Sequence, residues 1–136
     1  MGTLQDYMHT DVKTTTQDGT VWEAADIMSK SDISCLVVVE NDSPVGIITR
    51  RDIFEKVLVA RKNPDEVKVG EVMSSKIISL GPQATMVAAS GIMSDRKIKQ
   101  LPIVDEGKLV GIVTQTDIVR NINKMAKYDT SPITLD

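Results

Sequence analysis

The chain of 136 residues contains little of several residue types, and each scarcity excludes a class of protein. A single cysteine cannot form an intrachain disulfide, and one histidine with one cysteine cannot supply the ligands of an ordinary zinc site. Aromatic residues make up only 3% of the chain, so Val, Ile, Leu, Met and Ala must build the core. No apolar run approaches the roughly 18 residues of a membrane span, and the N-terminus lacks the apolar stretch of a signal peptide. We therefore expect a cytoplasmic protein without a membrane segment or a metal site.

Charge and motifs exclude further classes. The net charge of −3 disfavours non-specific binding of nucleic acid, which depends on a basic surface. The sequence has no Walker loop, no glycine-rich dinucleotide fingerprint and no nucleophile elbow, so we do not expect an enzyme. Cys35 lies in an apolar run and is predicted to be a buried thiol, whereas His9 lies among polar residues and is predicted at the surface. Trp22 fits equally well in the core or in a dimer contact.

The chain contains an internal duplication with an offset of 65 residues. The segment VGIITRRDI at 45–53 recurs as VGIVTQTDI at 110–118, and 15 of the 46 positions from 8 to 53 are identical without a gap. Each copy is small for independent stability, so we predict two similar halves packed about a pseudo-twofold axis. The predicted units are a first repeat at 4–61, a linker at 62–68, a second repeat at 69–126 and a polar tail at 127–136.

Hydrophobic patterning predicts that each repeat has the order β-α-β-β-α. Apolar residues at helical spacing alternate with short β-branched runs, and polar turns at 41–43 and 106–108 join the last two strands into hairpins. The expected elements of the first repeat are strand 12–15, helix 20–30, strands 35–39 and 45–48, and helix 52–61. Those of the second repeat are strand 77–80, helix 85–95, strands 101–104 and 109–113, and helix 117–127.

The repeated segment has two interpretations. Thr49 with Asp52, and Thr114 with Asp117, have the spacing of a helix capping box, and the glycine in each copy permits a close approach of backbone. The same groups suit a nucleoside phosphate, because a helix start attracts phosphate and a carboxylate can accept hydrogen bonds from two ribose hydroxyls. The residues alone leave both interpretations open.

The whole arrangement resembles a tandem CBS-domain pair, also called a Bateman module. The resemblance covers residues 4–126, and it depends on the openings YMHTDVKTT and VMSSKIISL, the helix cores AADIMSK and AASGIMSD, and the segment KIKQLPIVDEGKLVGIVTQTDI. It implies an α+β fold with two clefts between the repeats. It also implies a non-catalytic regulatory module that binds AMP, ADP, ATP or S-adenosylmethionine, requires no other cofactor, forms a disc-like homodimer and controls a protein partner.

The resemblance also implies roles for individual residues. Asp52 and Asp117 would hold ribose hydroxyls, and Thr49 and Thr114 would contact ribose or phosphate. The adenine pocket would be formed by Lys13, Thr14, Thr15, Ile33, Cys35, Ile77, Ile78, Ser79, Ile98, Gln100 and Pro102.

Charged residues differ between the copies. Arg50 and Arg51 stand where the second copy has Gln115 and Thr116, and Lys97 and Lys99 stand where the first copy has Asp32 and Ser34. We predict that these four cations bind phosphate, that a basic group of one copy can serve a ligand of the other, and that at least one cleft accepts a phosphorylated adenosine. The alternatives are a solvated surface for the cations and, for the whole chain, an interaction scaffold with empty clefts.

Overall fold

The computed structural model describes the backbone of residues 2–126 and the side chains of residues 2–121, so the predicted tail lies outside the described residues. No helix in this part of the chain is long and apolar enough to cross a membrane. The elements are α1 (Leu4–Tyr7), β1 (Thr14–Thr15), α2 (Val21–Ser31), β2 (Cys35–Glu40), β3 (Ser43–Thr49), α3 (Arg50–Ile53), the π-helix η1 (Phe54–Leu58), α4 (Val69–Val72), α5 (Met86–Arg96), β4 (Gln100–Asp105), β5 (Lys108–Thr114) and α6 (Gln115–Ala126).

The predicted hairpins are present, with equivalent registers in the two repeats. Leu36 pairs with Ile48 across β2 and β3, and Leu101 pairs with Val113 across β4 and β5. Each turn has two residues with positive φ, at 41–42 and at 106–107, as the tightest hairpin turns require. The turns are one residue shorter than predicted, because the third residue of each begins the next strand.

The leading strand differs between the repeats. In the first repeat β1 pairs with β2 in parallel, but residues 77–80 of the second repeat contribute only one bridge, from Leu80 to Ile103. The prediction of a strand over 77–80 was therefore wrong. Pro102 stands at the position of Val37, and a proline has no N–H to donate to a neighbouring strand, so the ladder cannot extend.

The second helix of the first repeat is also irregular. It begins at Arg50, passes into η1 and ends at Leu58, short of the predicted end at Arg61. Backbone bonds from Val59 N to Phe54 O and from Lys62 N to Val57 O have the longer i to i−5 spacing of a π-helix.

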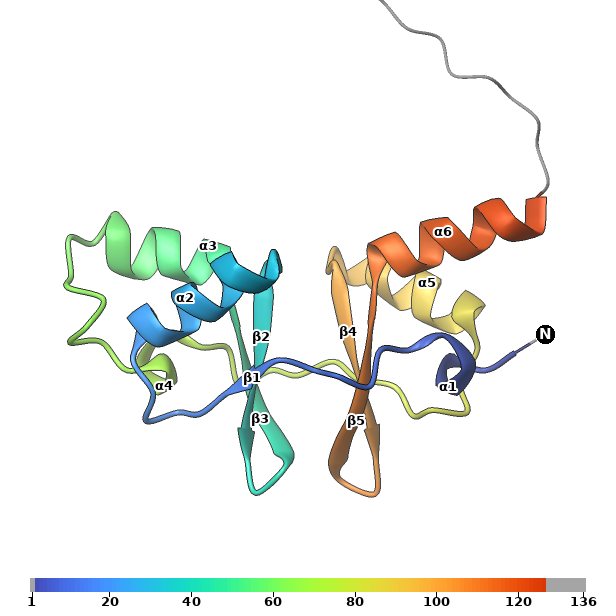
Figure 1. Ribbon diagram of the computed structural model, residues 1–136, viewed down its shortest axis with the longest axis horizontal. Helices are drawn as coiled ribbons and strands as arrows, with labels where there is room; N and C mark the ends of the chain where they lie inside the picture. The colour runs from blue at the N-terminus through green and yellow to red at the C-terminus, as the bar shows by residue number, and fades with distance from the viewer. Residues whose placement is uncertain (1, 127–136) are drawn as a thin grey trace, which may run out of the picture.

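The short opening helices cross between the halves. Figure 1 shows α1, drawn in dark blue, beside the second half, and α4, drawn in green, beside the first half. Backbone bonds join His9 to Ile112 and Ser74 to Ile47 in both directions, at 2.9 Å each. The spatial halves therefore exchange the opening segments of the two sequence repeats.

Two hydrophobic clusters form the core, and each cluster includes one of the crossing segments. Val69 and Val72 pack in the first cluster with Leu36 and Ile48, and Leu4 packs in the second with Leu101, Ile103 and Val113. The predicted linker also contributes to the first cluster, because Val67 is buried and its carbonyl accepts a 2.8 Å hydrogen bond from Val21 N. Neither half completes its core without a segment from the other repeat.

The glycines of the repeated segment make room for these crossings, as predicted. A Cβ at Gly46 would lie 2.9 Å from Ser74 O and 2.6 Å from Met73 Sδ. A Cβ at Gly111 would lie 3.0 Å from His9 O. Any side chain at either position would collide with the segment that crosses from the other repeat.

Candidate functional site

The two Thr-x-x-Asp motifs form the predicted helix caps. In the first, Asp52 N donates to Thr49 Oγ1 at 3.1 Å, while Thr49 N and Oγ1 each donate to Asp52 Oδ2 at 3.0 Å. The second motif repeats this pattern, with bonds of 2.8 Å from Thr114 N and Oγ1 to Asp117 Oδ2. The caps fix each carboxylate at the end of a hairpin strand, where it lies against its threonine.

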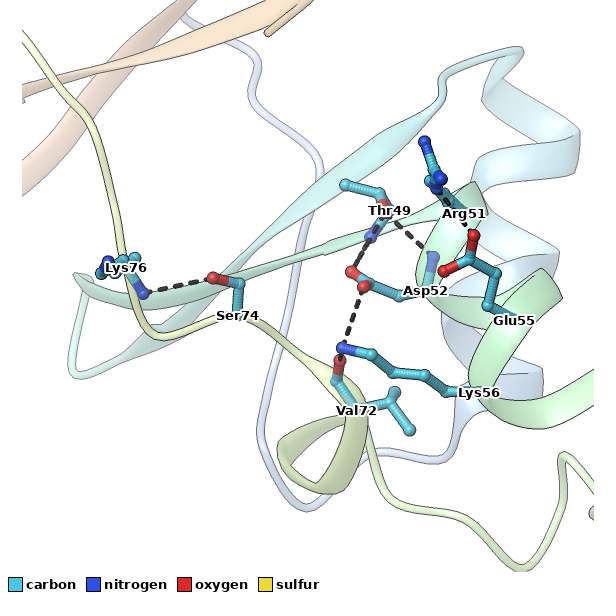
Figure 2. Close-up of polar contacts among 8 residues, drawn as sticks. All are labelled: Thr49, Arg51, Asp52, Glu55, Lys56, Val72, Ser74 and Lys76. Atoms are coloured by element: carbon cyan, nitrogen blue, oxygen red, sulfur yellow. Dashed lines mark hydrogen bonds and ion pairs between the residues drawn. The ribbon is translucent and has the colours of Figure 1, made fainter. Parts of the chain in front are cut away.

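The remaining carboxylate oxygen has a different partner in each motif. Lys56 Nζ lies 3.1 Å from Asp52 Oδ1 and also donates to Val72 O at 3.0 Å, as Figure 2 shows. Asp117 Oδ1 instead lies 2.8 Å from Nε2 of His9, which comes from the crossing segment of the first repeat. His9 is 54% exposed at its side chain, as a surface residue would be, but no sequence signal indicated that it contacts a carboxylate 108 positions away.

Asp117 has a perturbed acidity. Burial acts to raise its pKa, because only 7% of its side chain is exposed and a charged group is poorly solvated there. Hydrogen bonds from Thr114 N–H, His9 and the Thr114 hydroxyl, together with the charge of His9, outweigh burial and hold the pKa below its usual 3.8. Asp117 is therefore ionised at neutral pH.

Two cavities lie next to these caps, and each is lined by residues of both repeats. The histidine cavity, of about 600 Å³, is lined by residues 8–13 with Ile33, Cys35, Gln100, Ile112 and Thr114. The basic cavity, of about 540 Å³, is lined by Ser34, Cys35, Ile47, Thr49, Arg50, Arg51, Ser74, Lys76, Ile78, Lys97, Ile98, Lys99 and Gln100. Both volumes are typical of small-molecule sites, which span roughly 300–1,000 Å³.

The structure brings together many of the residues that the sequence suggested. Thr114 lines the histidine cavity and Thr49 lines the basic cavity, and each is bonded to its aspartate, which is not itself a lining residue. All four predicted cations line the basic cavity. Of the suggested adenine-pocket residues, Lys13 and Ile33 line the histidine cavity, Ile78 and Ile98 line the basic cavity, Cys35 and Gln100 line both, and Thr14, Thr15, Ile77, Ser79 and Pro102 line neither.

Cys35 and Gln100 form the wall between the cavities. They occupy equivalent positions in the two repeats, and the Cys35 thiol donates to Gln100 Oε1. Gln100 Nε2 lies 3.4 Å from Ser34 Oγ. The prediction of a buried thiol is confirmed, and burial raises the pKa of Cys35 to about 12, so it stays protonated at neutral pH.

Among the titratable lining residues, sequence reasoning missed three, which are His9, Asp11 and Lys76. The repeat alignment places Asp11 opposite Lys76, which could have marked both as a point of difference between the cavities. Among the residues whose side chains are described, no three His, Cys, Asp or Glu groups lie close enough together to hold a metal ion.

Comparison with known proteins is consistent with this duplicated architecture. The model of the family described as "CBS domain" matches the chain twice, over residues 4–59 and 69–124. The chain belongs to the CBS-domain family. As a tandem CBS pair it has the α+β fold that the resemblance implied, with two repeats related by a pseudo-twofold axis.

Relatives include the CBS domain-containing protein YhcV of Bacillus subtilis, which is 36% identical over 121 residues, covering 89% of this chain and 86% of that protein. The uncharacterized protein MK0525 of Methanopyrus kandleri is 43% identical over 112 residues, covering 81% of this chain. The chain spans only 57% of the length of MK0525 and of a second archaeal relative.

Solved structures of similar fold include the CBS domain pair of protein MJ0100. Its sequence is 30% identical to this chain and its TM-score is 0.81. The matched region covers 90% of this chain and 97% of the MJ0100 chain. It was solved in complex with 5′-methylthioadenosine and S-adenosyl-L-methionine.

Proposed function

We propose that this CBS pair is a non-catalytic regulatory module that binds adenosyl compounds in its two cavities and signals to a protein partner. The observation that carries the proposal is the pairing of each ligand-sized cavity with the threonine of a Thr-x-x-Asp cap. The adenosyl ligands of the MJ0100 pair support the ligand class. AMP, ADP, ATP and S-adenosylmethionine are the candidates, and no further cofactor is required.

In this proposal the caps also bind ribose. Asp52 and Asp117 accept hydrogen bonds from the two ribose hydroxyls, while Thr49 and Thr114 contact ribose or phosphate. The ribose would compete with Lys56 for Asp52 and with His9 for Asp117, because these residues now occupy the outer carboxylate oxygens. The adenine would lie against the apolar wall residues, Ile33 in one cavity and Ile98 in the other.

Isothermal titration with AMP, ATP and S-adenosylmethionine tests the proposal. We expect measurable binding of at least one ligand, and weaker binding after Asp52→Asn or Asp117→Asn, each acting on one cavity. Asp95→Asn is the matched control, since Asp95 is exposed and lines neither cavity. An absence of heat with all three ligands on folded protein would reject the proposal.

A scaffold without a ligand is the second candidate, and one observation favours it. Both oxygens of Asp52 and of Asp117 already have partners inside the protein, so each motif is complete as a cap. Thermal unfolding separates the candidates, because a ligand raises the midpoint in proportion to the logarithm of its concentration over its dissociation constant. A midpoint that no adenosyl ligand raises would favour the scaffold.

The proposal includes a homodimer, for which exposed apolar residues provide the surface. Trp22 is 55% exposed, so it is not a core residue, and Val87 is its exposed equivalent in the second repeat. Phe54 and Val119 form a second exposed pair at equivalent positions. In Figure 1 their helices α2, α3–η1, α5 and α6 lie beside the upper parts of the hairpins, away from the hairpin turns.

A surface that presents equivalent residues twice about a pseudo-twofold axis suits a second copy of the chain related by true twofold symmetry. We expect a dimer by sedimentation and its dissociation in Trp22→Ser with Phe54→Ser. A monomeric wild type at micromolar concentration would contradict this part of the proposal. A cytoplasmic location also belongs to the proposal and fits the single, reduced cysteine.

A further inference from the structure

Five cations from three separate segments surround the basic cavity. Arg50 and Arg51 come from α3, Lys76 comes from the segment after α4, and Lys97 and Lys99 come from the loop between α5 and β4. No aspartate or glutamate is among the residues described as lining this cavity. Cations of both repeats therefore gather around one site, where each half supplies only part of the set.

The equivalent positions 65 residues away carry no cation at all. They are Gln115, Thr116, Asp11, Asp32 and Ser34, three neutral and two acidic residues. In the histidine cavity the Lys13 ammonium lies 3.8 Å from Asp11, which offsets its charge. Because the two cavities lie at equivalent places in the duplicated fold, the choice of residues makes one strongly basic and leaves the charge of the other balanced.

The lysines are the cations most available to a ligand. Arg51 Nε lies 2.8 Å from Glu55 Oε1, as Figure 2 shows, and Arg50 Nη2 lies 3.7 Å from Asp32 Oδ1. Within the described part of the chain, no carboxylate oxygen lies within 4 Å of the amines of Lys76, Lys97 or Lys99. These lysines come from two segments that meet at the cavity, an arrangement suited to an extended anion.

We infer that the basic cavity selects its ligand by the number of phosphates and takes the polyphosphate chain of an adenosine di- or triphosphate, held by cations of both repeats. The inference rests on the proposed function and specifies the ligand class of one of its two cavities. Ammonium and guanidinium groups form charge-assisted hydrogen bonds to phosphate oxygens, so each added phosphate engages a further cation. The histidine cavity lacks this excess of cations and takes an adenosyl ligand without a phosphate chain.

Titration of adenosine, AMP and ATP at one fixed ionic strength tests the inference. On the wild type we expect affinity to rise from adenosine to AMP to ATP, and the ATP affinity to fall as salt is added, because these cations are exposed. The double variant Lys97→Gln, Lys99→Gln should weaken ATP about five- to tenfold, as expected for two exposed charge pairs, and leave adenosine unchanged.

The control is the double variant Lys30→Gln, Lys62→Gln, which changes the net charge equally but alters exposed residues outside both cavities. It should change the ATP affinity by less than about twofold. An equal loss of ATP affinity in both double variants would overturn the inference, because a general field effect would then explain the result.

The outcomes also separate the inference from the proposed function. If adenosine or S-adenosylmethionine binds but ATP binds no more tightly, the inference fails and the proposed function stands. If no adenosyl ligand binds, the proposed function fails. Inorganic triphosphate is the last probe: competition with ATP that is weakened in the Lys97, Lys99 variant supports the inference, and no competition overturns it.

Discussion

The two halves of this protein hold the same carboxylate in different ways. Asp52 is held by Lys56, one helical turn away in the same repeat, whereas Asp117 is held by His9 from the opposite end of the chain. The threonine contacts are nearly identical, because they follow from the geometry of a helix start. The comparison indicates that the cap is common to both halves, while the partner of the second carboxylate oxygen comes from the same repeat in one half and from a crossing segment in the other.

The two cavities extend the same contrast. Both lie beside a cap and share Cys35 and Gln100, yet five cations line one cavity and a lysine paired with an aspartate lies in the other. A duplicated scaffold thus provides two sites of similar volume whose charge differs.

Core truncation should show the largest effect and tests whether the halves are equivalent in stability. Leu36 and Leu101 are equivalent and fully buried, so Leu36→Ala and Leu101→Ala should each lower the free energy of unfolding by about 2–5 kcal/mol. Urea denaturation should show a single transition for both, since α1 and α4 join the two cores. Two separate transitions would show that the halves unfold independently.

The crossings can be tested at the two glycines. Gly46→Ala and Gly111→Ala should each cost about 1–3 kcal/mol, because the new Cβ would meet the carbonyl of Ser74 or of His9. Gly91→Ala is the control: a Cβ there meets no atom within 4 Å, and alanine favours the helix by up to about 1 kcal/mol. Destabilisation by Gly91→Ala as large as that of the other two variants would contradict the steric explanation.

Removal of the caps should have a smaller and nearly equal effect. Thr49→Ala and Thr114→Ala each remove the acceptor for a helix N–H and should cost about 1 kcal/mol in thermal or urea unfolding. Thr116→Ala, an exposed change at the second residue of α6, serves as the control. A cap variant as stable as this control would show that the cap does not contribute to folding.

Removing the partner of the second carboxylate oxygen should have a small effect on stability that differs between the halves. His9→Ala takes the partner from a nearly buried carboxylate and should cost about 1 kcal/mol. Lys56→Ala should cost about 0.5 kcal/mol, since Asp52 is 16% exposed and water can replace the half-exposed lysine. A greater loss from Lys56→Ala in parallel urea titrations would reverse this ranking.

Acid should destabilise the protein in part through Asp117. Its pKa is lower in the folded chain than the usual 3.8, so its carboxylate stabilises the fold above the unfolded pKa of about 3.9. This contribution is lost as pH falls through the folded pKa. Urea midpoints measured from pH 5 to pH 2.5 should fall less steeply in Asp117→Asn than in the wild type, and equal slopes would contradict this account.

Much of the fold was predictable from local pattern. The hairpins, the first helices and the caps follow from periodicity, β-branched runs and Thr-x-x-Asp spacing, because neighbouring residues decide these features. The missing strand at 77–80 is different, because it reflects the absent N–H of Pro102. Pro102 is visible in the sequence, but its effect depends on which segment lies beside it in the fold.

The sequence by itself determined the duplication, the fold class, the caps and the residue types available to a ligand. Only the tertiary structure decided which residues meet. The crossing of α1 and α4 brings His9 to Asp117 and places Lys76 in the cavity that Arg50 also lines, so one basic cavity is assembled from both repeats. Contacts of this kind join positions far apart in the chain. They depend on the opening segment of each repeat packing into the hydrophobic core of the other half, and local periodicity carries no information about that packing.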